Sequence, residues 1–426
     1  MKLSKRLLLL VVSVMFVMLL GACNSKEQAS SQSNSSGTAS TESGKEYPQG
    51  VTDKEIVIGM TGPQSGPTAI YDSARKSAES YIKYVNENGG VNGRTIKLIA
   101  YDDQGQPAKA TQAVKRLVEQ DKVYALVGSI GTVSNLASLD YFKEKGIPTV
   151  MVGSGSSKFV QPPIKNVLGL GVINYAVEAN ILLEYTVKEL GAKKIAIAYQ
   201  NDDLGKEGYE TVKNSIAQYD GVEIVQEVNF LTTDVEFSSH AQKIQKSNPD
   251  AILVFSSPNP VANLKKDLYK IGMKDIPFVV NSVGANDTKM FDLAGADVWS
   301  GTISAASIPM PGSSDDESLQ LFVERFGKDY PNEPLVGVSQ SGWGQVEVFV
   351  EALKLAGDDL SWDNLINSLY KLDKWKGSMY AGVSFSPENH YGSTSLFITE
   401  AKDGKINPIS NIMTYDPATK TVTVEE

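Results

Sequence analysis

The 426-residue sequence contains one cysteine and two histidines, so few side chains are available as metal ligands or strong nucleophiles. The single cysteine, Cys23, excludes a disulfide framework and a cysteine-based metal site within the chain. His240 falls in a helical pattern and His390 in the turn "PENHYG", and we expect both at the surface. A G-x-S-x-G nucleophile elbow is also missing. The sequence therefore predicts a protein that is not an enzyme and uses neither a cofactor nor a metal.

Basic residues are outnumbered by acidic ones, 40 to 50, which gives a formal net charge of −10, and no stripe of lysine and arginine stands out. An acidic surface without such a stripe argues against nucleic acid as a partner. Beyond the N-terminal region, no run of residues is apolar enough to cross a membrane. The remaining length of nearly four hundred residues indicates two domains or one body with two lobes.

The N-terminus has the pattern of an export signal. Lys2, Lys5 and Arg6 precede an apolar run over residues 7–20, and small residues follow. The motif "LGAC" resembles the bacterial lipobox, which implies a signal peptide over residues 1–22 and a lipid on Cys23. An uncut membrane anchor is the alternative, since the run could span if tilted. In either case the rest of the chain lies outside the cytoplasm, at the extracellular face of a bacterial membrane.

Residues 23–53 are rich in serine, glycine and threonine and contain hardly any apolar residue until the end of the segment. Such a composition cannot bury enough surface to order itself. We expect this segment to be a flexible tether between the membrane and the folded body.

From Ile56 onward, short runs rich in β-forming residues alternate with helical patterns. The runs "TIKLIAYDD", "VYALVGS" and "IPTVMVG" are examples, and each is followed by a loop or an amphipathic segment. Strands that alternate with helices form parallel sheets covered on both faces. The pattern predicts an α/β fold with two similar lobes, followed by a tail of strands and turns.

The stretch "IGMTGPQSGPTAIYD" joins a strand to a helix through a glycine-rich loop, which is the layout of a phosphate-binding loop. Gly59, Gly62 and Gly66 do not have the spacing of a nucleotide-binding motif, and the first lysine downstream is Lys76, inside the helix. The free N–H groups at such a helix start suit a carboxylate as well as a phosphate. We therefore expect a loop that lines a cleft and binds no nucleotide.

Two further loops have the same layout, "VGSIGTVSN" at 127–135 and "VGSGSSKF" at 152–159. In parallel α/β sheets such loops gather at the carboxyl ends of the strands, where ligands bind. Their hydroxyl groups could form an anion-binding rim, although glycine and serine are also ordinary turn residues. The pairs Asp102–Asp103 and Asp202–Asp203 also follow strands, and we expect them to cap turns or bond within the cleft.

The sequence from about Lys54 to the C-terminus resembles periplasmic binding proteins of the leucine/isoleucine/valine-binding type. The motifs that carry the resemblance are "SGP" at 65–67, "GGVNG" at 89–93, "ELGAKKIAIAYQNDDLGKEG" and "FSPENHYG". With the lipobox, the chain looks like the substrate-binding component of an ABC importer. The resemblance implies two Rossmann-like lobes with parallel sheets and a three-crossing hinge, the type I periplasmic binding protein fold.

The resemblance also implies the lobe boundaries. Crossings are expected near 171–175, 301–305 and 377–381. The first lobe would comprise residues 54–173 with 304–378, and the second 175–302 with 380–426.

Binding residues follow from the resemblance position by position. In branched-chain amino acid binders, serine or threonine hydroxyls and backbone N–H groups of the two loops hold the ligand carboxylate. The matching positions here are Ser129, Ile130, Gly131, Thr132, Gly153, Ser154, Gly155 and Ser156. An aromatic residue that covers the ligand maps to Tyr71.

Three other family positions differ. The acidic partner of the ligand ammonium falls at about Ser282, and two cleft tyrosines fall at Leu204 and near Ser257. Because a buried charge without a partner is costly, Asp202 or Asp203 could replace the missing acid, or the ligand lacks an amine. Amino acids, aromatic or aliphatic acids and amides therefore all stay open as ligands.

The expected function is capture of a small organic solute by hinge closure and its delivery to an ABC permease, by a monomer anchored to membrane lipid through Cys23. A stand-alone sensory lipoprotein of the same fold is the alternative.

Overall fold

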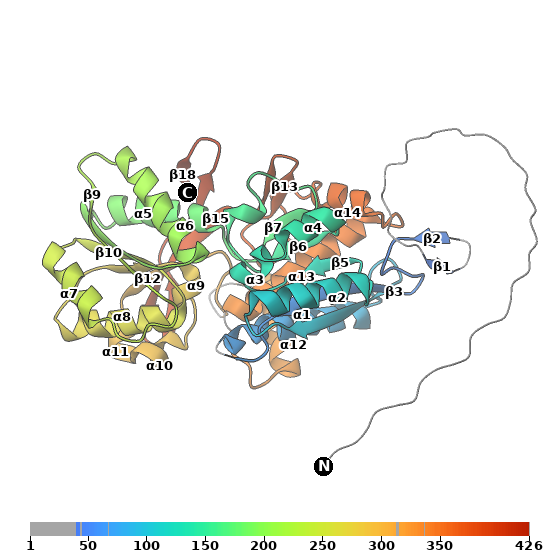
Figure 1. Cartoon of the computed structure of the whole chain (residues 1–426), viewed down its shortest axis with the longest axis horizontal. Helices are drawn as coiled ribbons and strands as arrows, with labels where there is room; N and C mark the ends of the chain where they lie inside the picture. Colours follow the sequence, from blue (N-terminus) through green and yellow to red (C-terminus); the bar gives the residue numbers. More distant parts are fainter. Residues whose placement is uncertain (1–39, 43–44, 67, 312–314, 336, 426) are drawn as a thin grey trace, which may run out of the picture. The chain divides into compact units, whose positions relative to one another are not determined.

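The computed structural model describes residues 40–42, 45–66, 68–311, 315–335 and 337–425 (Figure 1). The predicted signal peptide, Cys23 and most of the predicted tether lie outside the described residues. Within the described ranges, no helix combines the length and the apolar character needed to cross a bilayer.

The first sheet has five parallel strands in the order β4-β3-β5-β6-β7. These strands are β3 (Glu55–Gly62), β4 (Thr95–Asp102), β5 (Ala125–Val127), β6 (Thr149–Val152) and β7 (Val167–Leu170). The helices packed with them are α1 (Asp72–Glu87), α2 (Pro107–Glu119), α3 (Thr132–Leu136), α4 (Leu139–Lys145), α12 (Glu317–Asp329), α13 (Gly337–Ala356) and α14 (Trp362–Leu369). We call this group the first lobe.

The second sheet has the order β18-β17-β15-β12-β11-β10-β8-β9, with β16 paired to β15. Its strands are β8 (Lys194–Gln200), β9 (Glu223–Phe230), β10 (Ala251–Phe255), β11 (Phe278–Val280), β12 (Thr302–Ala306), β15 (Ser395–Lys402), β16 (Lys405–Pro408), β17 (Met413–Asp416) and β18 (Thr421–Val424). Its helices are α5 (Tyr175–Lys188), α6 (Asp203–Ser215), α7 (Ser238–Ser247), α8 (Pro258–Lys270), α9 (Ser282–Ala285), α10 (Met290–Ala294) and α11 (Ala296–Trp299). We call this group the second lobe.

Short elements complete the fold. They are β1 (Ser40–Glu42), β2 (Lys45–Tyr47), β13 (Ser384–Ser386), β14 (Asn389–Gly392) and the 3-10 turns η1 (Ala69–Tyr71), η2 (Ser157–Phe159) and η3 (Ile216–Gln218). Strands β8 to β12 are parallel, whereas the tail strands β15 to β18 pair antiparallel. The predicted α/β fold with parallel sheets in two lobes is confirmed, and the tail extends the second sheet.

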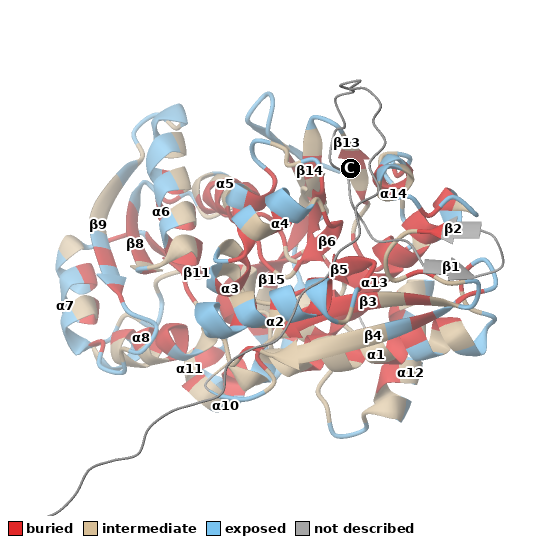
Figure 2. Cartoon of the chain, turned by 45° about the vertical axis from the view of Figure 1, so that its right-hand side comes forward, coloured by how far each residue is buried: buried red, intermediate tan, exposed pale blue. Residues whose placement is uncertain are grey.

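The sequence pattern explains the buried helix faces. Ala74, Ala78 and Ile82 recur at helical spacing in α1 and are all buried. Helix α13 is buried over most of its length and packs against α1, β5 and β6. Figure 2 shows the buried residues concentrated on β5, β6 and α13, while α2 and α4 expose part of their surface. The glycine-rich loops therefore start from β3, β5 and β6, the mostly buried strands in the middle of the sheet.

The ordered body begins before the end of the predicted tether. Tyr47 and Val51 are buried in the first-lobe core, and the Gln49 amide donates to the carbonyl oxygens of Val118 and Val123. The apolar residues of "YPQGV" cover the start of β5, whereas the serine-rich part of the segment has none to bury.

Strand pairing and core contacts indicate where the chain crosses between the lobes. Strand β12 pairs within the second sheet as far as Ala306, and Val383 and Phe385 belong to the first-lobe core. We therefore propose that the second crossing follows Ala306, beyond 301–305, and that the third lies near 393–394, beyond 377–381. The first crossing, between β7 and α5, stays as predicted.

The first crossing is held by hydrogen bonds from α13 and from the segment before β13. The carbonyl oxygen of Gly171 accepts from the hydroxyl of Ser341 at 2.6 Å and from that of Tyr380 at 2.9 Å. A β-carbon on Gly171 would lie 2.0 Å from the Gln345 amide nitrogen, so a larger residue would have to displace that buried side chain. This contact gives the chain a defined exit point from the first lobe.

The two histidines differ in their surroundings. His390 is buried, with Nδ1 2.9 Å from the Val167 carbonyl oxygen and Nε2 2.9 Å from the Tyr370 hydroxyl, so its predicted surface position is wrong. The ring also packs against that of Tyr370, with the ring centroids 5.7 Å apart. His240 is partly exposed and packs against Phe230 and Phe237.

Candidate functional site

Three hydroxyl groups meet where the two glycine-rich loops approach the start of α5. The Thr132 Oγ1 atom lies 2.8 Å from Ser154 Oγ and 2.9 Å from the Tyr175 hydroxyl. Thr132 begins α3, Ser154 follows β6 and Tyr175 begins α5, so the three come from different elements. We call these three residues the hydroxyl cluster. Hydroxyl donors at this place can bind a carboxylate or another oxygen-rich group.

Two glycines allow the loops to come this close. A β-carbon on Gly153 would lie 2.6 Å from the Ile130 side chain, and Ile130 and Gly153 form a parallel bridge. The Gly131 N–H donates to the Gly153 carbonyl oxygen, and Gly131 has φ +109°, where glycine is favoured. The Gly155 carbonyl oxygen accepts from the Tyr175 N–H at 2.8 Å. The predicted loop residues are thus brought together, mostly through the backbone.

Ser129 and Ser156 are near the hydroxyl cluster but their side chains have other partners. The Ser129 hydroxyl accepts from the Thr61 N–H at 3.1 Å, which ties it to β3. The Ser156 hydroxyl donates to the carboxylate of Glu207 at 3.1 Å. Both serines are almost fully buried. Their hydroxyls hold the loops in place and are not directed to the hydroxyl cluster.

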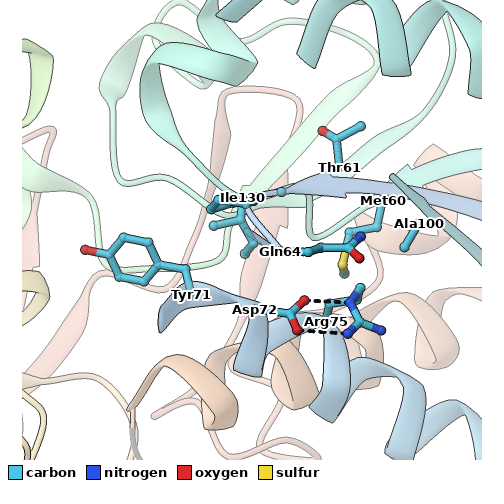
Figure 3. A pocket seen from close by; sticks show the side chains of 10 residues that line it. Met60, Thr61, Gln64, Tyr71, Asp72, Arg75, Ala100 and Ile130 are labelled. Atoms are coloured by element: carbon cyan, nitrogen blue, oxygen red, sulfur yellow. Dashed lines mark hydrogen bonds and ion pairs between the residues drawn. The ribbon is translucent and has the colours of Figure 1, made fainter. Parts of the chain in front are cut away.

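Tyr71 extends from the first lobe toward groups of the second. Desolvation raises the pKa of its hydroxyl above the usual range. The negative charges of Tyr175 in its ionised form, Asp287 and Asp202 raise it further, which shows that these groups are close. Figure 3 shows the Tyr71 ring directed away from the pocket residues around Arg75. The ring is therefore well placed to cover a ligand.

A small pocket lies on the other side of Tyr71, with a cavity of about 10 Å³, the size of one water molecule. The Asp72 carboxylate and the Arg75 guanidinium close one side of it through two hydrogen bonds of 2.6 and 2.9 Å (Figure 3). The remaining lining residues are Met60, Thr61, Gly62, Pro63, Gln64, Tyr71, Ala100 and Ile130.

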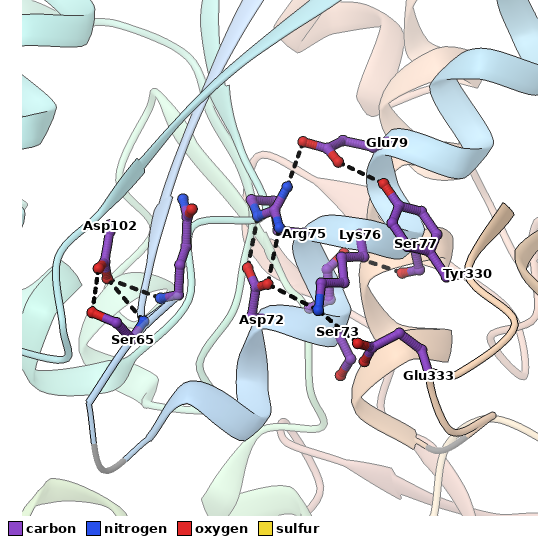
Figure 4. Close-up of polar contacts among 12 residues, drawn as sticks. Ser65, Asp72, Ser73, Arg75, Lys76, Ser77, Glu79, Asp102, Tyr330 and Glu333 are labelled. Atoms are coloured by element: carbon purple, nitrogen blue, oxygen red, sulfur yellow. Dashed lines mark hydrogen bonds and ion pairs between the residues drawn. The ribbon is translucent and has the colours of Figure 1, made fainter.

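The first glycine-rich loop is held by Asp102 at the end of β4. Its carboxylate accepts from the N–H groups of Gln64 at 2.9 Å and Ser65 at 3.3 Å, and from the Ser65 hydroxyl (Figure 4). Asp103 is buried and accepts from the Gly105 N–H at 2.8 Å. Both aspartates therefore shape turns, as expected. Within the described residues no group of acidic, histidine or cysteine side chains could hold a metal ion.

The predicted positions of the second lobe occupy the ends of its strands and the starts of its helices. Asp202 caps α6 by accepting from the Gly205 N–H at 3.2 Å, and Leu204 is buried in that helix. The Ser257 N–H donates to the Gln200 side chain at 2.9 Å. The Ser282 N–H donates to the carboxylate of Glu178 at 2.6 Å. Asp203 pairs with Lys158 of the first lobe.

Glu207 of α6 joins the two lobes. Its carboxylate accepts from the Ser157 hydroxyl at 2.6 Å, from the Ser157 N–H at 3.0 Å and from the Ser156 hydroxyl. Burial raises the pKa of Glu207, while these hydrogen bonds oppose the rise. We call Glu207 with Ser156 and Ser157 the interlobe clasp.

Sequence reasoning missed three residues of this region, Tyr175, Glu178 and Glu207. Tyr175 and Glu178 stand in "NYAVEANILL", where a carboxylate interrupts an otherwise apolar helical pattern. That interruption was the available signal for Glu178. No such signal in the sequence marks Glu207, because an acidic residue in an amphipathic helix is usually solvated.

Comparison with known proteins identifies the family. Residues 55–405 match the family described as periplasmic binding protein. "Leu/Ile/Val-binding protein homolog 3" of Brucella melitensis is 21% identical over 353 residues, covering 83% of this chain and 93% of the relative.

Solved structures share the fold. The branched-chain amino acid transporter substrate binding protein LivJ from Streptococcus pneumoniae, in complex with isoleucine, has a TM-score of 0.73 at 21% identity and covers 84% of this chain and 99% of its own. A fatty acid ABC transporter substrate-binding protein from Thermomonospora curvata has a TM-score of 0.77 at 23% identity. It covers 88% of this chain and 96% of its own. Family members bind solutes and are not enzymes, in agreement with the sequence. Because the match spans most of the sequence, the chain belongs to the periplasmic binding protein family.

Proposed function

We propose that the protein is the lipid-anchored, extracellular solute receptor of an ABC importer and that it captures an amino acid or a related small carboxylate. The observation that carries this proposal is the hydroxyl cluster of Thr132, Ser154 and Tyr175, which combines side chains from both lobes. Relatives named as leucine/isoleucine/valine binders support the same ligand class.

Capture follows from the position of the contacts. A ligand carboxylate bound by Thr132 and Ser154 would also meet Tyr175 of the second lobe and lie near Tyr71. A ligand that contacts both lobes stabilises the closed arrangement over the open one. The closed form then becomes the species that a membrane permease recognises.

The membrane attachment rests on the sequence alone. The lipobox motif "LGAC" and the serine-rich segment after it support a lipid on Cys23 and a tether to the body. A stand-alone sensory lipoprotein is the alternative to import, and uptake of a labelled solute by cells that carry or lack the gene distinguishes the two.

The binding site is tested by calorimetric titration of amino acids and small carboxylates. Thr132→Ala combined with Tyr71→Ala should weaken the binding of any ligand that the unaltered protein holds. The Thr132 hydrogen bond to a charged group alone accounts for about 10-fold to 100-fold. Thr111→Ala, which removes a partly exposed hydroxyl of α2, serves as the matched control and should leave affinity unchanged. Unchanged affinity in the double variant would contradict the placement of the site.

A further inference from the structure

The first turn of α5 carries a buried carboxylate that no cation neutralises. Glu178 is 1% exposed and is flanked by Val177 and Ala179, which belong to the second-lobe core. No ion pair to Glu178 occurs among the residues that the structure describes. A buried carboxylate without a cation is costly, so this position calls for a reason beyond packing.

Glu178 shares a helix face with Tyr175 of the hydroxyl cluster. Residues three apart on a helix share a face, so Glu178 lies one turn along α5 from Tyr175, whose hydroxyl contacts Thr132. Its carboxylate accepts from the Ser282 N–H at 2.6 Å. Ser282 is the position at which the sequence predicts the missing partner of a ligand ammonium. Helix α5 therefore supplies, in contact with Ser282, the carboxylate that α9 lacks at that position.

The two sides of the site differ in polarity, with neutral hydrogen-bond donors on one side and carboxylates on the other. The first lobe contributes hydroxyl donors at Thr132 and Ser154. The second lobe contributes Glu178, and Asp202 and Asp287 lie close enough to Tyr71 to raise its pKa. A ligand that is negative at one end and positive at the other matches this arrangement.

The raised pKa of Glu178 follows from its burial. Burial raises the pKa of its carboxyl to about 7, and hydrogen bonds from Ser282 only partly oppose this. Glu347, a buried carboxyl in the first-lobe core, also has a pKa of about 7 because of burial, but it accepts from the Trp343 indole N–H and the Met379 N–H. The two glutamates differ in place, since Glu178 shares α5 with Tyr175 of the hydroxyl cluster, whereas Glu347 is on α13 in the first-lobe core.

We infer that Glu178 binds the ammonium group of the ligand, so that this protein selects α-amino acids over the corresponding acids without an amine. The inference rests on the proposed function, because it assumes that the hydroxyl cluster holds the carboxylate of the same ligand. It assigns to α5 a specificity residue that the family positions in the sequence do not indicate.

The experiment titrates ligand-free protein with matched pairs of compounds, leucine with 4-methylpentanoate and phenylalanine with 3-phenylpropanoate among them. Each pair differs only in the α-amino group. We expect the unaltered protein to bind an amino acid more tightly than its partner acid. Glu178→Gln should weaken the binding of the amino acid by about 100-fold or more, because a buried charge loses its partner. The affinity for the amine-free acid of the same pair should stay unchanged.

Glu178→Gln separates a binding role from a structural one. The amide oxygen can still accept from the Ser282 N–H, so a residue that only supports α9 would show no change in ligand preference. Glu347→Gln removes another buried carboxyl, remote in sequence from α5, and should leave the preference intact. Retained binding of the amine-free acid shows that the Glu178→Gln variant is folded.

Three results would overturn the inference. The unaltered protein could prefer the amine-free acid, which contradicts the role of Glu178 and leaves the proposed capture of carboxylates standing. Glu178→Gln could keep the preference of the unaltered protein, which also contradicts the role of Glu178 and leaves the proposed capture of carboxylates standing. Finally, absence of binding for every pair would contradict the proposed function together with the inference.

Discussion

At Gly155, a β-carbon would lie 2.3 Å from the Ile173 carbonyl oxygen and 2.5 Å from the Tyr175 ring. The loop after β6 therefore touches the first crossing and the start of α5 through backbone alone. This contact aligns Tyr175 with Thr132, so the hydroxyl cluster depends on a residue that has no functional group.

Gly155→Ala should displace Tyr175 and overpack the crossing. We expect the free energy of unfolding to fall by about 1–3 kcal/mol, the usual cost of overpacking. Urea unfolding measures this, and ligand titration should show weaker binding. Gly327→Ala in α12 is the control, because a β-carbon there meets nothing within 4 Å and alanine favours a helix. Equal stability of the two variants would contradict the role assigned to Gly155.

Glu347 makes stability depend on pH. Burial raises the pKa of its carboxyl to about 7, above the ordinary value of 4.5 in the unfolded chain. Between these two values the folded protein binds more protons than the unfolded chain, so stability falls as pH rises through this window. The loss between pH 4.5 and pH 8 is on the order of 3 kcal/mol for this group.

Glu347→Gln should reduce that dependence, since an amide does not titrate, and the part that remains includes Glu178, whose pKa burial also raises to about 7. The measurement is the urea midpoint at pH 5 and pH 8 for both proteins. Glu351→Gln, on the same helix and paired with Lys354, serves as the control. A variant whose midpoint still falls as steeply as that of the unaltered protein would show that Glu347 is not the source.

Among the elements, α6 and η2 meet at the interlobe clasp. Glu207 is on α6, and Ser156 and Ser157 lead into η2, so opening of the lobes has to break these hydrogen bonds. The charge of Glu207 strengthens them, because hydrogen bonds to an ionised acceptor are about twice as strong as neutral ones.

Glu207→Gln should therefore favour the open arrangement. We expect the bound ligand to dissociate about tenfold faster, which corresponds to the loss of about 1.4 kcal/mol. Stopped-flow dissociation measures the rate, and Glu210→Gln on the exposed face of α6 is the matched control. If both variants release ligand at the rate of the unaltered protein, the clasp does not contribute to closure.

The elements were predictable from sequence because periodicity reports which face is buried. Helix α1 illustrates this, with its apolar residues buried at the expected spacing. The direction of a loop side chain was not predictable. Ser129 and Thr132 are three residues apart, yet one hydroxyl bonds to β3 and the other to the hydroxyl cluster. Glu178 and Ser282 are separated by 104 positions, and no local pattern connects them.

For the whole molecule, the anchor and the folded body have separate origins in the sequence. The body begins near Tyr47, while the proposed lipid attachment is at Cys23. The segment between them contains few residues that could pack, so binding and anchoring should be separable functions.

Cys23→Ser should prevent lipidation and leave ligand binding unchanged. The expected result in a bacterial host is loss of labelled fatty acid from the protein and its release from the membrane fraction. Ser25→Ala, two residues further along, is the control and should stay labelled. Continued labelling of the Cys23→Ser variant would contradict the lipobox interpretation.

The packing of α13 against α1 has a consequence for biosynthesis. All strands of the first sheet precede residue 171, but the helix that covers one face of it ends at Ala356. At about 5–20 residues per second, the ribosome needs roughly ten seconds or more to add the intervening residues. During this interval the face formed by Ile58, Met60 and Val127 lacks Trp343 and Phe349, its later partners in the core. The first lobe therefore cannot complete its core before α13 is synthesised, and we expect the nascent chain to stay incompletely folded during this interval.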